Sequence, residues 1–186
     1  TAFHRRHSDD YFLDEFGGIS LTHETKVRSI ALSGRHAFSK EIALNYTLQS
    51  TADSINSSSL EEGPFTTRNY TKISLLPEYS IVCDKIHSLI FRFGASFDDT
   101  NRDSSELSPI FDLTWLTEQA DGDAQSIYFS YEQTSQVPGY TAIGGSETTG
   151  LFRSNHDLGR DKTQNLEIGT QVMRRDWSIE AAVSYR

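Results

Sequence analysis

The sequence predicts an all-β chain that folds as an antiparallel up-and-down transmembrane β-barrel, a partial barrel of about nine strands. Three observations lead to this prediction. Apolar and polar residues alternate in segment after segment, short and long connections alternate along the chain, and no apolar run is long enough for a transmembrane helix. Alternation gives each strand one apolar and one polar face. A barrel with lipid outside and water or a plug inside accommodates both faces.

Nine segments are candidate strands, and the alternation is clearest in six of them. The candidates lie at residues 1–8, 24–36, 39–52, 68–82, 86–98, 108–118, 125–135, 162–173 and 176–186. In the third, Ile42, Leu44, Tyr46 and Leu48 share one face, and the polar residues between them share the other. The fourth, fifth, seventh, eighth and ninth repeat this pattern. In the fourth, Pro77 cannot donate a ladder hydrogen bond, so we expect a bulge or a local edge there.

The connections between these strands fall into two classes that alternate along the chain. Short ones lie near residues 37–39, 83–85, 120–123 and 174–175, and long ones at about 9–23, 53–67, 99–107 and 136–161. An antiparallel meander with short turns at one rim and long loops at the other produces this order, as outer-membrane barrels do. Because nine is odd and terminal strands would stay unpaired, we expect residues 1–186 to be part of one larger β-barrel domain.

Composition restricts the possible partners and chemistry. The formal net charge is -9, which argues against a nucleic-acid partner. Cys83 is the single cysteine, so the chain has neither an intrachain disulfide nor a thiolate metal cluster. No Gly-x-Ser-x-Gly elbow is present, and we expect no enzymatic activity. His4 and His7, beside two aspartates, have a spacing that could ligate a metal, but on a strand they point to opposite faces, which favours a polar strand end.

The stretch from Ser126 to Arg186 resembles the late barrel region of TonB-dependent outer-membrane receptors. A strand at residues 128–133 leads into a long loop, which returns through a pattern that the family shares. The residues that match this pattern are Asn155, Leu158, Glu167 and Gly169, with Asp161 in place of Glu and Thr163 in place of Ser. The chain departs from the pattern at Gly159-Arg160, where the family commonly has Lys-Pro. The final strand, Trp177 to Arg186, resembles the next strand of the family.

The resemblance implies an outer-membrane receptor and transporter that takes up a scarce nutrient such as a metal–siderophore complex. The expected partners are outer-membrane lipid, a small-molecule ligand such as a metal chelate, and, in the full-length protein, a plug domain and TonB. Residues 1–186 contain neither a plug domain nor a TonB box, and we expect no cofactor. The substrate stays open among ferric siderophores, cobalamin, nickel complexes, carbohydrates and peptides.

The long loop at 136–161 contains the candidate ligand-binding residues. Tyr140, Phe152 and Arg153 bring aromatic and cationic groups to the outer rim, where they could stack and bind anions, and Asn155 follows them. The alternative is an ordinary loop packed on its neighbours. The inward-facing charges Arg92, Glu132, Glu167 and Glu180 are interpreted as lumen residues that hydrogen-bond a plug.

Two other architectures fit part of the pattern. A soluble β-barrel or sandwich that binds a small ligand or a partner would turn its apolar faces inward, and it would be recovered without detergent. A complete small porin-like barrel would need an even number of strands.

Overall fold

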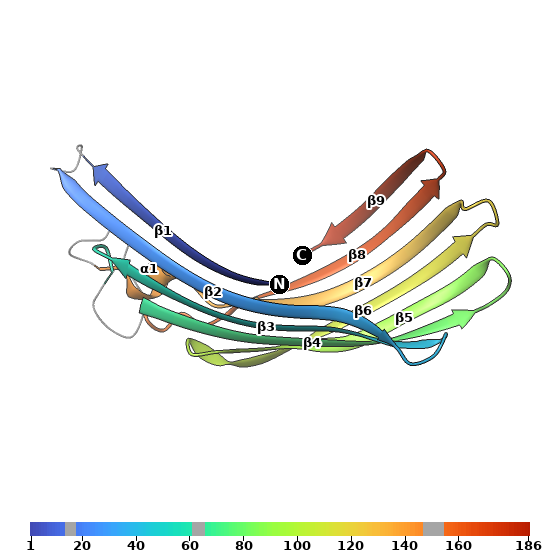
Figure 1. The fold of residues 1–186 in the computed structure, drawn as a ribbon, viewed down its shortest axis with the longest axis horizontal. Helices are drawn as coiled ribbons and strands as arrows, with labels where there is room; N and C mark the ends of the chain where they lie inside the picture. The colour runs from blue at the N-terminus through green and yellow to red at the C-terminus, as the bar shows by residue number, and fades with distance from the viewer. Residues whose placement is uncertain (14–17, 61–65, 147–154) are drawn as a thin grey trace.

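The computed structural model describes residues 1–13, 18–60, 66–146 and 155–186, which form a nine-stranded antiparallel sheet and one short helix (Figure 1). The elements are β1 (Ala2–Leu13), β2 (Ile19–Ala37), β3 (Ile42–Ser57), β4 (Thr67–Val82), β5 (His87–Thr100), β6 (Asp103–Glu118), β7 (Ala124–Gln136), α1 (Tyr140–Gly144), β8 (Asp161–Arg174) and β9 (Trp177–Tyr185). Each strand pairs with the next along the chain, so the order is β1 to β9 without a crossover. The all-β class and the up-and-down order of nine strands are confirmed.

The sheet is an open, curved meander in the part of the chain that the structure describes. Its edge strands are β1 and β9, which do not pair with each other. β1 pairs with β2 only as far as Ile30, and β9 pairs with β8 only from Leu166 onward, so both edges are stepped. Figure 1 shows the sheet bent like a trough. The described residues therefore form a curved wall and not a closed barrel.

The strand register places the predicted apolar residues on one side of the sheet, here called the apolar face. One row across it runs through paired residues of β2 to β6, namely Leu32, Leu48, Ile73, Phe97 and Leu107. Rows nearer the short turns continue it into β7, β8 and β9, where Ile127, Ile168 and Val183 lie on the same side. These side chains are exposed, with Leu32 at 57%, Phe93 at 52% and Val183 at 74%. The sheet thus presents an apolar surface with nothing packed on it.

The opposite side of the sheet, here called the polar face, contains buried hydroxyls and charges. Glu78, Ser96 and Ser108 are each at most 6% exposed. The buried apolar residues of the described chain are few, and three of them, Leu60, Val137 and Ile143, lie in the connections near the ends of β3 and β7. The protein therefore buries polar groups on one face while large apolar side chains on the other stay accessible.

Two of the predicted long connections are largely strand. Residues 9–13 and 19–23 extend the β1–β2 ladder, and the prediction of a long loop at 99–107 was wrong, because β5 and β6 are joined through Asn101 and Arg102. Apolar alternation fades in these extensions, and this made them resemble loops. The backbone ladder continues there because its hydrogen bonds do not depend on side-chain polarity. The connection from β7 to β8 is long, and it contains α1.

The β4–β5 ladder is interrupted near Pro77. Pairing runs from Tyr70 to Leu75 and resumes at Glu78 in the same register, so the expected bulge is absent and a gap in the ladder takes its place. β4 has neighbours on both sides, so Pro77 does not mark a sheet edge. Opposite the gap, a Cβ on Gly94 would lie 2.0 Å from the carbonyl oxygen of Leu75, so the two backbones approach each other closely.

Among the described residues, no helix is long and apolar enough to cross a membrane.

Candidate functional site

The connection between β7 and β8 reaches across the sheet to the end of β3. α1 lies at the end of the sheet where β2 begins and β3 ends (Figure 1). The Ser146 amide donates to the Ser59 carbonyl at 2.9 Å, and Leu60 and Gly145 form a β-bridge. Val137 and Ile143 are 1% and 5% exposed, so apolar burial holds this connection in place. Two segments about 90 residues apart in the chain meet here.

Five residues form a cluster at this rim, which we call the rim cluster: Asp53, Arg68, Tyr70, Arg102 and Tyr140. Arg68 Nη2 donates to Asp53 Oδ2 at 2.8 Å, and Arg68 Nε lies 3.2 Å from the same oxygen. The Tyr140 hydroxyl donates to Asp53 Oδ1. The Arg68 guanidinium carbon lies 5.0 Å from the ring centres of Tyr70 and of Tyr140, within the range of cation–π attraction. Each side chain thus has a charged or aromatic neighbour.

Burial and charge determine the state of Tyr140. Removal from water, followed by the hydrogen bond to the Asp53 carboxylate, raises the pKa of the Tyr140 hydroxyl far above its usual range. The hydroxyl is therefore neutral and donates at physiological pH. The guanidinium carbon of Arg102 lies 5.9 Å from the centre of the Tyr140 ring, and Arg102 donates to the Thr67 carbonyl. The rim cluster therefore has two guanidinium groups beside one carboxylate.

A second ion pair joins Arg160, the residue before β8, to Asp98 near the end of β5. Arg160 Nη1 donates to Asp98 Oδ1 at 2.9 Å, and the two side chains are 3% and 12% exposed. The same nitrogen donates to Ser135 Oγ at 3.1 Å, and the Arg160 amide donates to Asp103 Oδ2 at 2.8 Å. A hollow of about 350 Å³ separates this pair from the rim cluster, and Arg68, Tyr70, Asp98 and Ser135 are among its lining residues. The hollow lies on the polar face, and polar side chains line it.

The structure brings one of the four predicted ligand-binding residues into the rim cluster. Tyr140 belongs to it. Asn155 is near α1, because its amide donates to the Ala142 carbonyl at 2.9 Å, but its side-chain Oδ1 accepts from the Asp157 amide at 3.0 Å within its own turn. Phe152 and Arg153 lie outside the described residues.

The predicted inward-facing charges, Arg92, Glu132, Glu167 and Glu180, all lie on the polar face by register. Three of them bond to other residues of that face. Arg92 Nε donates to Glu78 Oε2 at 2.8 Å, and the Tyr128 hydroxyl lies 3.0 Å from Glu167 and 3.2 Å from Glu180. Arg92, Glu167 and Glu180 therefore bond to other residues of the sheet.

Sequence reasoning missed the other members of the site. Asp53 was expected in a loop, Arg68 at a strand end, and Asp98 and Arg160 had no partner in the pattern. Face parity was a usable signal for Arg68 and Asp98, which lay on the polar side of predicted strands, whereas Asp53 and Arg160 fell in predicted loops, where no face can be assigned. Their proximity had no such signal, since it depends on the path of one long connection.

The histidine–aspartate spacing near the start of the chain forms a pair and not a metal centre. His7 Nε2 lies 2.6 Å from Asp9 Oδ2, while His4 lies on the other face, opposite Arg28. In the described ranges, no group of three or more His, Cys, Asp or Glu side chains is placed to hold a metal ion.

Comparison of the chain with models of known protein families, with curated proteins and with solved structures gave no match.

Proposed function

We propose that this chain forms part of the wall of an outer-membrane β-barrel. The observation that carries the proposal is the exposed apolar face, backed by a polar face whose charges bond to one another. A soluble sandwich or barrel would turn the apolar residues inward, and water would then meet the polar ones. Lipid outside and a water-filled or plugged lumen inside satisfy both faces.

The height of the apolar face supports this proposal. On β5 it extends from Leu89 to Phe97, which is about 26 Å along a strand at roughly 3.3 Å per residue. A tilt of about 40° reduces this to about 20 Å across the membrane, close to the ~25 Å apolar band of such barrels. Trp115 and Trp177 lie on this face near the short turns, 41% and 52% exposed, where an interfacial aromatic is favoured.

We further propose that the complete protein is a TonB-dependent receptor for a scarce nutrient such as a metal chelate. The resemblance of residues 126–186 to that family supports this narrower proposal. The rim cluster adds to it, because guanidinium and phenol groups bind oxygen-rich anionic ligands by charge-assisted hydrogen bonds and stacking. The ligand would meet the rim cluster first and pass inward as the plug rearranges, and no bond is made or broken.

A pair of neighbouring substitutions tests the membrane wall. Ile127 is on the apolar face and 51% exposed, and Ser126 beside it is on the polar face. Ile127 pairs with Trp115 near the edge of the apolar band, so we expect Ile127→Arg in the full-length protein to cost about 1 kcal/mol of folding free energy in lipid, and so to reduce the amount of heat-modifiable protein in outer membranes. Ser126→Arg is the matched control and should assemble normally.

Two results would contradict the wall proposal. One is equal assembly of Ile127→Arg and of the unaltered protein. The other is recovery of the natural protein in the soluble fraction without detergent, which would favour the soluble alternative.

The receptor proposal has its own test. Cells without the gene should lose growth on one scarce chelate as sole source of its metal, and Arg68→Gln should weaken binding of that chelate without lowering the amount of protein in the membrane. Normal growth on every chelate and nutrient tried would contradict the receptor proposal and leave the wall proposal intact.

A further inference from the structure

We propose that the apolar face contains, at its border with the polar strand extensions, a binding site for a phosphate-bearing lipid. The inference rests on the proposed position of the sheet in a membrane. It starts from an arrangement of hollows along β2 and β3 on the outside of the wall. Three hollows adjoin one another there, and neighbouring ones share lining residues.

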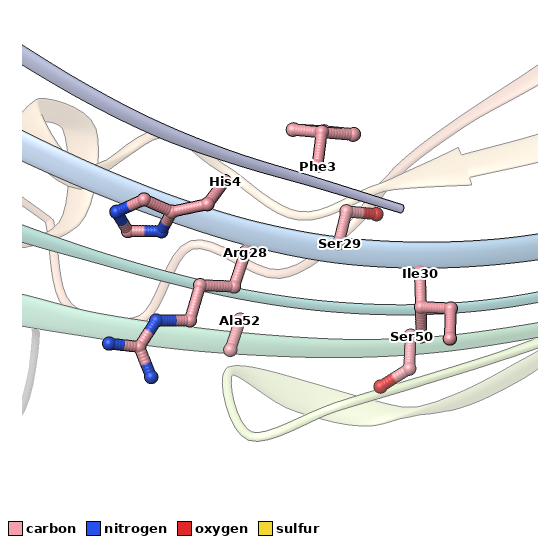
Figure 2. A pocket seen from close by; sticks show the side chains of 7 residues that line it. All are labelled: Phe3, His4, Arg28, Ser29, Ile30, Ser50 and Ala52. Carbon is pink, nitrogen blue, oxygen red and sulfur yellow. The ribbon is translucent and has the colours of Figure 1, made fainter. Parts of the chain in front are cut away.

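The first two hollows are basic and have a floor of small residues. One of about 330 Å³ is lined by Lys26, Arg28 and Ala52, and also by Asp53, whose carboxylate is bonded to Arg68. The next, of about 490 Å³, is lined by Arg28, Ala52 and His4. Figure 2 shows Arg28 and Ser50 on the same side of the sheet. The two β3 residues that line this hollow, Ser50 and Ala52, both have small side chains. A small floor leaves room above it for a headgroup.

The third hollow is apolar and continues from the second. It has about 300 Å³ and is lined by Ile30, Leu32, Leu48 and Ile73, and it shares Ile30 and Ser50 with the basic hollow. Arg28 and Ile30 are two residues apart on one face of one strand, so about 7 Å separates the basic end from the apolar end. The whole groove therefore fits a molecule with an anionic head and a hydrocarbon tail.

The guanidinium group of Arg28 is available to a ligand. Arg28 is exposed, and His4 is its partner in the β1–β2 ladder. Neither residue forms an ion pair within the described part of the chain. Glu24 is the acidic side chain nearest along β2, and both its partners are basic: Arg6 at 3.0 Å and Lys26 at 2.9 Å. Three fixed positive charges thus face one carboxylate, in a chain whose net charge is -9. An anionic occupant complements this local excess of positive charge.

The position of the groove selects a lipid over a free anion. Its basic end lies just beyond the apolar row that ends at Leu32 and Leu48, at the level where the headgroups of a bilayer would lie. A free phosphate would use only the basic half. A lipid phosphate would contact Arg28 and Lys26 while its acyl chain lies on Ile30, Leu32 and Ile73.

The test uses the full-length protein in a neutral detergent, titrated by native mass spectrometry with a short-chain phosphatidic acid. Short-chain phosphatidylcholine and inorganic phosphate are the comparison probes. We expect one phosphatidic acid to bind with preference, and Arg28→Gln to weaken its binding about fivefold, as expected for one basic residue near a membrane surface. Arg5→Gln is the matched control, because Arg5 is on β1 with its side chain on the opposite face. It should leave the affinity unchanged.

A second variant separates head from tail. Ile30→Ser should weaken the binding of phosphatidic acid and leave any binding of inorganic phosphate unaltered. The proposal is overturned if inorganic phosphate binds as tightly as the lipid, if phosphatidylcholine does, or if Arg5→Gln weakens binding as much as Arg28→Gln. These outcomes differ from a failure of the proposed function, which would appear as assembly of Ile127→Arg or as recovery without detergent.

Discussion

At the scale of single residues, the carboxylate of Glu78 is the group on the polar face that joins several strands. It accepts from Arg35 Nη2 at 2.7 Å, from Arg92 Nε at 2.8 Å and from Asn45 Nδ2 at 3.0 Å, and it is 6% exposed. These three donors come from β2, β5 and β3, on both sides of β4. One side chain therefore links four adjacent strands through charge-assisted hydrogen bonds.

Glu78→Gln keeps the shape and removes the charge. We expect it to lower the free energy of unfolding by about 2 kcal/mol, because two guanidinium groups lose a charged acceptor while the amide keeps only part of the bonding. The measurement is urea unfolding of the full-length protein in detergent, followed by tryptophan fluorescence. Glu118→Gln, at an exposed strand end, is the control and should shift the midpoint little. Equal midpoints for the two variants would contradict the role given to Glu78.

Gly94 marks the close approach of β5 to β4. A Cβ at this position would lie 2.0 Å from the backbone carbonyl oxygen of Leu75, so Gly94→Ala requires the two strands to move apart. We expect a loss of about 1–3 kcal/mol of stability, as in other overpacked sites. Gly139→Ala has no atom within 4 Å of its added Cβ and is the matched control. A normal unfolding midpoint for Gly94→Ala would show that the approach is not required.

At the scale of elements, the connection that contains α1 is held to the sheet at a few points. Tyr140 bonds Asp53 of β3, and Arg160 fixes the start of β8 to Asp98 of β5. A five-residue helix has little stability of its own, so these contacts and the burial of Ile143 hold its position.

The docking of α1 should weaken at alkaline pH. The pKa of Tyr140 is raised in the folded state, so the undocked hydroxyl loses its proton at lower pH than the docked one. The contribution is complete below the ordinary tyrosine pKa of about 10 and is lost progressively as pH rises above it. Limited proteolysis of the β7–β8 connection should accelerate above about pH 10 in the unaltered protein. The Tyr140→Phe variant should be cleaved faster at neutral pH, and its cleavage rate should not increase further above about pH 10. The same increase in Tyr140→Phe would contradict the role given to the Tyr140 hydroxyl.

At the scale of the whole molecule, the two rims differ. The short turns lie at one end of the sheet, and the rim cluster and α1 lie at the other. In the proposed barrel, the first end faces the periplasm and the second faces outward. Cys83 lies in the turn between β4 and β5 and is exposed, which makes it a reporter of orientation.

In a full-length protein with Cys83 as its only cysteine, Cys83 should not react with a membrane-impermeant maleimide in intact cells. It should react after the outer membrane is permeabilised. In a Cys83→Ser background, Asp157→Cys is the comparison, since Asp157 is exposed at the opposite rim. We expect it to react in intact cells. Labelling of Cys83 in intact cells, with Asp157→Cys protected, would reverse the proposed orientation.

The sequence by itself determined the faces of the sheet. Side chains alternate along every strand, so Ile42 to Leu48 and Trp177 to Tyr185 could be assigned to one side before any pairing was known. The same rule placed Arg92, Glu167 and Glu180 on the other side. The number and order of strands followed from the same alternation together with the short turns.

Only the tertiary structure decided how far the strands extend and which residues meet at the rim. The ladder of β1 with β2 continues through residues 9–13, where polar and apolar residues do not alternate regularly, and 19–23, because backbone hydrogen bonds form whatever the side chains are. Tyr140 reaches Asp53 because one long connection passes over strands that lie between them in the sheet, and no local pattern encodes such a path. Alternation is a property of neighbouring residues, whereas the rim cluster and the lipid groove depend on the register of several strands at once.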